Sequence, residues 1–145
     1  MSTKRGFTAA AIGLTMLSLG LSVGAQGGNT YKARLSPVPI DATMAPNVAG
    51  SGSVTATLTG TKLSITGTFE GLRSPATTAN IRFGRKGVRG ASLFDLTVTK
   101  AISGTIAGNL TLTPVQMDDL KEGKLYVQIQ SEKAPDGNLW GWLLK

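Results

Sequence analysis

The chain has 145 residues, with 15 Lys and Arg against 8 Asp and Glu, and it contains neither cysteine nor histidine. Their absence excludes disulfides, a thiol nucleophile, an imidazole base and any zinc or copper site built on histidine or thiolate ligands. We therefore expect a domain that is stabilised by its apolar core alone, with no cofactor, no metal and no catalytic site.

An export leader is predicted at the N-terminus. Lys4 and Arg5 precede an uncharged run of 17 residues, Phe7 to Val23, and the small residues Val23-Gly24-Ala25 resemble a cleavage site. The alternative, an uncleaved membrane anchor, would have a run at the short end of the spanning range. We expect residues 1–25 to be removed as a signal peptide, so that the protein is secreted or periplasmic and keeps no transmembrane anchor.

The remaining residues, 26–145, suffice for one domain with a net charge of +5, because two of the basic residues leave with the leader. From Val54 to Phe69, apolar residues alternate with Thr and Ser on either side of Gly60-Thr61, which predicts a β-hairpin with one buried face. Further strands are predicted at 31–35, 79–83, 93–99, 104–112, 125–130 and 139–144, and a Pro-rich loop at 36–52. We predict an all-β fold: one antiparallel Greek-key β-sandwich or barrel, immunoglobulin-like or superoxide-dismutase-like, with one short helix.

The one helix is predicted after residue 112. Thr113 is a suitable N-cap, Pro114 fits the first helical position, and Gln116 completes a capping box. Gly123 is expected to end the helix. Its acidic side chains suit the helix dipole better than they suit a calcium site, since nothing here resembles an EF-hand loop.

Several motifs together point to a known family. They are GLRSPATTANIR at 71–82 with spaced glycines after it, ARLSPVP at 33–39, LKEGKLYVQIQS at 120–131 and PDGNLWG at 135–141. In these motifs the chain resembles the CHRD domain, a repeat first described in chordin and common in exported bacterial proteins. The resemblance covers nearly all of residues 26–145 and implies a fold more firmly than an activity.

The chain departs from the family pattern at its histidines. Where the pattern has His-Ile-His, Asn80 and Arg82 flank Ile81, and where it has a third histidine, this chain has Gln130. If the family histidines form a metal or proton-transfer site, this chain lacks it, because Asn, Gln and Arg are poor or impossible ligands for the same ions. This departure argues against an activity like that of superoxide dismutase.

Strand alternation predicts that polar and aromatic side chains of three strands share one outer face. If Ile81 faces the core, its neighbours Asn80 and Arg82 face outward. The same argument places four further side chains on the outer face: Gln128, Gln130, Trp140 and Trp142. Two alternate tryptophans would make an apolar platform for a sugar ring, a peptide or a protein. Because Trp is also highly buried on average, the pattern leaves a core position equally open.

A basic, glycine-rich loop is expected at the rim of this face. Arg85, Lys86 and Arg89 lie among glycines, and no acidic residue occurs between Gly71 and Phe94. The cluster predicts an anionic partner, such as an acidic polysaccharide, a lipid head group or an acidic protein; the alternative is a solvated loop. Nucleic acid is a poor candidate, since the domain is exported, moderately basic and without an RNA-binding aromatic signature.

We interpret the chain as an exported, non-catalytic binding module for an anionic polysaccharide or an envelope or extracellular protein. One alternative is a structural component of an envelope assembly. Another is an enzyme that works through carboxylates, for which Glu70, Asp95 and Asp136 are the candidates, although no spacing pairs them.

Overall fold

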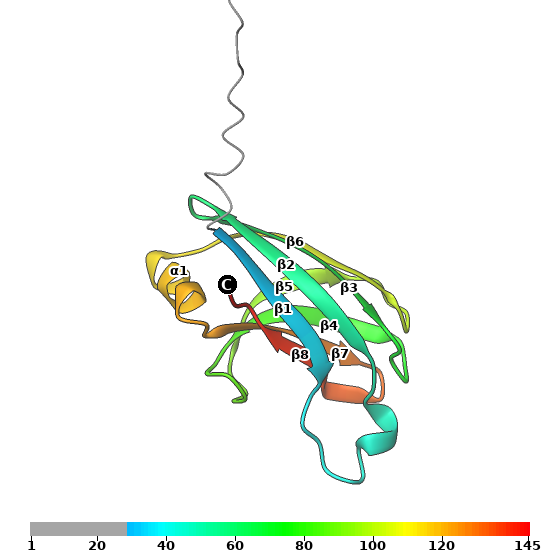
Figure 1. Ribbon diagram of the computed structural model, residues 1–145. Coiled ribbons are helices and arrows are strands. Elements are labelled where there is room, and N and C mark those ends of the chain that lie inside the picture. The colour runs from blue at the N-terminus through cyan, green and yellow to red at the C-terminus, as the bar shows by residue number, and fades with distance from the viewer. Residues whose placement is uncertain (1–28) are drawn as a thin grey trace, which may run out of the picture.

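The computed structural model describes residues 29–145, and the predicted leader with its cleavage site lies outside the described residues (Figure 1). The fold is all-β, as predicted: eight antiparallel strands close into one barrel, and one short α-helix is packed beside it. The elements are β1 (Thr30–Pro37), β2 (Ser51–Thr59), β3 (Lys62–Glu70), β4 (Ala76–Phe83), β5 (Ser92–Val98), β6 (Gly104–Thr111), α1 (Pro114–Lys121), β7 (Leu125–Ser131) and β8 (Ala134–Trp142), with a 3-10 turn at Ala45–Asn47. No helix within residues 29–145 is long and apolar enough to cross a membrane.

The strands follow the order β1-β2-β3-β6-β5-β4-β7-β8 around the barrel, so β6 and β5 stand between β3 and β4. The first and last strands close it. They pair at Ser36–Trp140, and the same register continues at Lys32–Leu144, whose two backbone hydrogen bonds are 2.8 and 2.9 Å long. Between these pairs, a Cβ at position 141 would overlap a β1 carbonyl oxygen, so Gly141 allows the two backbones to approach and the barrel to close.

The core follows from the alternation read in the sequence. Apolar side chains of every strand point into the barrel, and many of them are fully buried. The largest of these side chains are Tyr31, Leu35, Leu63, Ile65, Ile81, Ile106, Leu125, Ile129 and Leu139. On the opposite side, β2, β3 and β6 carry exposed hydroxyl side chains. These are Ser51, Ser53, Thr55, Thr57, Thr59, Ser64, Thr66, Thr68, Thr105 and Thr111.

The predicted helix cap is confirmed. The Thr113 hydroxyl accepts a hydrogen bond from the Gln116 backbone N–H at 3.2 Å, and the Gln116 side-chain oxygen accepts one from the Thr113 N–H at 3.0 Å. Gly123 follows the helix with a φ of +72°, a left-handed conformation that glycine adopts without strain.

The predicted start of the last strand, residue 139, is wrong by five residues. The β7–β8 hairpin turns at residues 132–133, between the paired Ser131 and Ala134, so the last strand begins before its predicted start. Asn138 stabilises the added segment: its side chain donates to the Ser131 hydroxyl at 3.1 Å and accepts from the Ala49 N–H at 3.2 Å.

Candidate binding groove

A second apolar cluster lies outside the barrel, on the outer face of β7 and β8. It comprises Val38, Tyr126, Trp140 and Trp142. The ring centroids of Tyr126 and Trp142 are 4.5 Å apart, and those of the two tryptophans are 4.7 Å apart. Both tryptophans do point away from the barrel interior, but each is only 7% exposed. The expectation of a flat, exposed platform is therefore wrong. The alternative, a position in the main core, is wrong as well, because the two indoles belong to a separate small cluster.

The cover over this cluster is the loop from β4 to β5, residues 84–91, which we call the strap. Its backbone is fixed to the cluster at both ends. Trp142 Nε1 donates a hydrogen bond to the Gly84 carbonyl at 2.8 Å, and the Gly90 N–H donates to the Tyr126 hydroxyl at 2.8 Å. Arg82 Nε donates to the Gly90 carbonyl at 2.9 Å. The strap is thus part of the packed structure and hides most of the indole surface.

Two of the amides that were expected to reach solvent are buried. Asn80 and Gln128 are opposite each other in the β4–β7 register and face outward as predicted, yet they are only 6% and 3% exposed. Gln128 Nε2 donates to the Asp136 carbonyl at 3.3 Å, whereas Asn80 Oδ1 has no hydrogen-bond partner among the described residues. Both side chains point away from the barrel interior, as predicted, but the prediction that they reach solvent was wrong.

Asn80, Arg82 and Gln130, the three positions that the motif resemblance matched to histidines, lie on one face. Asn80 and Arg82 are on β4, and Gln130 is opposite Thr78 on the neighbouring strand β7, where it accepts the Thr78 hydroxyl at 3.1 Å. The predicted grouping of these side chains is therefore real. In this chain each position carries a side chain that bonds or packs within the protein.

The basic residues of the strap divide into two groups. Arg89 Nη1 donates to the Asp136 carbonyl at 2.7 Å and so ties the strap to β8, whereas Arg82 ties it to β4. Arg85 and Lys86 are exposed, and Lys86 lines an open groove beside the tryptophans. Of the three basic residues of the predicted loop, Arg89 therefore holds the strap, and Arg85 and Lys86 are free of such bonds within the described residues.

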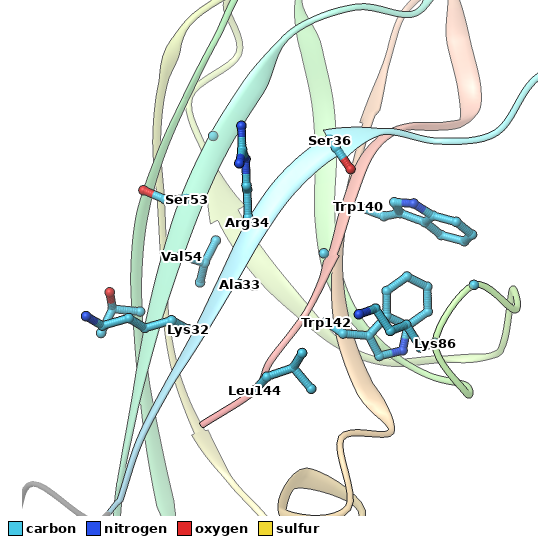
Figure 2. A pocket seen from close by; sticks show the side chains of 14 residues that line it. Lys32, Ala33, Arg34, Ser36, Ser53, Val54, Lys86, Trp140, Trp142 and Leu144 are labelled. Atoms are coloured by element: carbon cyan, nitrogen blue, oxygen red, sulfur yellow. The ribbon is translucent and has the colours of Figure 1, made fainter.

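The groove has a volume of about 950 Å³ and lies between the strap and the first two strands (Figure 2). Figure 2 shows Lys32 and Arg34 on one side and Lys86 close to Trp142 on the other. The lining residues are Lys32, Ala33, Arg34, Ser36, Gly52, Ser53, Val54, Thr55, Lys86, Gly87, Trp140, Gly141, Trp142 and Leu144. One wall is therefore aromatic and apolar, and the other carries cations and hydroxyls.

The charge in the groove is of one sign. It holds three cationic side chains and no carboxylate. Within residues 29–145 the one ion pair joins Lys124 to Glu122 at 2.7 Å, so Lys32, Arg34 and Lys86 are not neutralised by carboxylates of that part of the chain. Unpaired cations around a concavity attract anions, and the planar guanidinium of Arg34 can bind a carboxylate through two hydrogen bonds.

The sequence analysis did not identify Lys32 and Arg34. Their outward direction was readable, because Tyr31, Ala33 and Leu35 alternate with them and are buried. The closure of β1 against β8, which brings these cations beside the tryptophans, has no local signal in the sequence.

The acidic residues do not form a comparable site. Glu70, Asp95 and Asp136 lie on β3, β5 and β8, and no two of them are partners in the strand register. In the described part of the chain, no group of three or more Asp or Glu side chains is placed to hold a metal ion.

Comparison with known proteins agrees with the motifs. The family model of the CHRD domain matches residues 31–143, which is most of the chain. No curated protein and no solved structure gives a significant match. The chain belongs to the CHRD domain family.

Proposed function

We propose that this chain is an exported, non-catalytic binding module whose groove holds an anionic polymer, in the first place an acidic polysaccharide. The observation that carries the proposal is the groove itself, in which Lys32, Arg34 and Lys86 share the lining with two indoles and have no ion-pair partner within residues 29–145. Such a site offers charge for an acid group and apolar surface for a sugar ring.

The two walls favour a sugar over a simple anion. A pyranose ring has an apolar face of C–H groups and a rim of hydroxyls. Leu144 and the exposed edges of Trp140 and Trp142 offer apolar contact to that face, and the Ser53 and Thr55 hydroxyls of the other wall can exchange hydrogen bonds with the rim. Phosphate or another small anion would use the cations alone.

Several features support a binding role without catalysis. The chain has no histidine and no cysteine, and its candidate carboxylates lie on separate strands.

The strand order β3-β6-β5-β4 supports the Greek-key description of the barrel. In that topology three consecutive strands, here β4, β5 and β6, are neighbours, and a fourth strand, here β3, lies beside the last of them. Export after removal of residues 1–25 would place the module where such polysaccharides occur, and the mass of the mature protein tests that cleavage.

The proposal is tested by isothermal titration with polygalacturonate, hyaluronan and neutral dextran. In the variant Lys32→Gln/Arg34→Gln/Lys86→Gln, affinity for the acidic polymers should fall about tenfold or more, since each exposed charge contributes up to about 1 kcal/mol. The control Lys62→Gln/Lys100→Gln/Lys133→Gln removes the same charge at exposed positions outside the groove. Equal losses in both variants, or equal binding of dextran, would contradict a specific groove.

A protein partner or a role in an envelope assembly is the second candidate, because an apolar and cationic groove also fits an acidic protein surface. Analytical ultracentrifugation at micromolar concentration separates the two. Self-association that the groove variant abolishes would favour assembly over polysaccharide binding.

A further inference from the structure

We propose that the groove continues across β2 onto β3 and takes a linear heteropolysaccharide in which an acidic sugar alternates with a neutral one. The acidic unit would lie at the tryptophan end and the neutral unit over β2 and β3. This inference rests on the proposed function of the groove and specifies its ligand.

The first argument is continuity. A second hollow, of about 370 Å³, adjoins the groove and shares Arg34, Gly52 and Ser53 with it. Its floor extends to Thr68 and Glu70 on β3. In the strand register Arg34 is opposite Ser53, and Ser53 is opposite Thr68, so these residues form one row across three strands.

The second argument is length. Neighbouring strands lie about 4.8 Å apart, so a path from β8 over β1 and β2 to β3 is about 14 Å long. That path is longer than one pyranose ring. A site of this extent suits successive units of a polymer chain, and a single sugar would leave half of it empty.

The third argument is the change of charge along the path. Lys32, Arg34 and Lys86 line the tryptophan end without a carboxylate, whereas the far hollow, which shares Arg34, also carries Glu70, which is exposed and has no ion-pair partner within residues 29–145. A polymer charged on every unit would bring a carboxylate close to Glu70. A neutral unit there would meet the Ser53 and Thr68 hydroxyls and could donate hydroxyl or amide hydrogens to the Glu70 carboxylate.

The test compares two hexasaccharides by isothermal titration: hyaluronan, which alternates glucuronate with N-acetylglucosamine, and oligogalacturonate, which is charged on every unit. We expect the hyaluronan hexasaccharide to bind about fivefold more tightly. Glu70→Gln should raise oligogalacturonate affinity about two- to fivefold, the range for an exposed charge pair, and should not raise that of hyaluronan.

The path itself is tested through its hydroxyls. Ser53→Ala/Thr68→Val should weaken hyaluronan binding about three- to tenfold, as expected for the loss of two hydrogen bonds. The control Thr57→Val/Ser64→Ala changes the same two strands outside both hollows and should leave affinity unchanged. A hyaluronan disaccharide should bind more weakly than the hexasaccharide.

The outcomes separate this inference from the proposed function. If both hexasaccharides bind equally, depend on the groove cations and ignore Glu70→Gln, the alternating ligand is wrong and the polyanion groove stands. If disaccharide and hexasaccharide bind equally, the extended path is wrong. If neither ligand binds, the proposed function fails and this inference fails with it.

Discussion

The outer surface of the barrel has two faces that differ in how far other segments of the chain cover them. On β7 and β8 the outward Tyr126, Trp140 and Trp142 form a buried cluster, and the strap is hydrogen-bonded to it. On β2, β3 and β6 the outward side chains are mainly Ser and Thr, and they are exposed. Strand alternation decides on which side of a sheet a residue lies, but its neighbours decide whether it meets water. The groove lies where the covered face gives way to the open one.

The largest difference between the two faces should appear when a tryptophan of the covered face is removed. Trp142→Ala deletes an indole that packs on Tyr126 and bonds to the Gly84 carbonyl, so the free energy of unfolding should fall by about 3–5 kcal/mol. Denaturant unfolding measures this loss. A loss below about 1 kcal/mol would mean that the outer cluster is not a genuine core.

A smaller effect is expected from the strap itself. A Cβ at position 90 would overlap the Phe83 carbonyl oxygen, so Gly90→Ala must displace the strap and should cost about 1–3 kcal/mol. Tryptophan emission should shift to the red, and acrylamide quenching should rise as the indoles become exposed. The neighbouring exposed residue provides the control, Ser92→Ala, which should change neither signal.

Loss of a single hydrogen bond between the strap and β8 should lower the stability less than Gly90→Ala does. Arg89→Gln removes the hydrogen bond from the strap to the Asp136 carbonyl and should lower the free energy of unfolding by about 0.5–1.5 kcal/mol. Faster hydrogen exchange of the strap amides would localise the effect. The control Arg85→Gln removes the same charge from an exposed position and should leave the hydrogen-exchange rates of the strap unchanged. An equal effect of both variants would point to the lost charge and not to the lost hydrogen bond.

The smallest change in the free energy of unfolding is expected for substitutions on the exposed face of β2 and β3. Thr57→Val/Ser64→Ala removes two exposed hydroxyls from β2 and β3, and the free energy of unfolding should stay within about 0.5 kcal/mol. Thermal or denaturant unfolding checks this. A loss as large as that of Gly90→Ala would show that this face is also covered, or is paired with a second surface in solution.

The sequence was sufficient for features that depend on near neighbours. The hairpin of β2 and β3 and the Thr113–Gln116 capping box could be predicted because alternation and spacing set them locally. For Trp140 and Trp142, strand alternation gave the outward direction as one of two alternatives that it left open. Each of these features involves residues close in the chain or on one strand.

Features that join distant segments could not be predicted. The burial of Asn80 and Gln128 depends on how neighbouring strands and loops pack around them in the folded barrel, which strand alternation alone does not encode. Lys32 and Arg34 reach the groove only because β1 pairs with β8, more than 100 residues later in the chain. The groove is therefore a product of barrel closure.

The most direct test of the account is a titration of ¹⁵N-labelled protein with hyaluronan hexasaccharide, followed by NMR chemical shifts. If the groove binds the acidic glycan, the amides of 32–36, 53–55, 86–87 and 140–144 and the Trp142 indole should shift together, with saturation. The amides of β5, which is absent from the lining of either hollow, should stay unchanged. Shifts confined to other segments, or no shifts at millimolar ligand, would contradict a polysaccharide site in this groove.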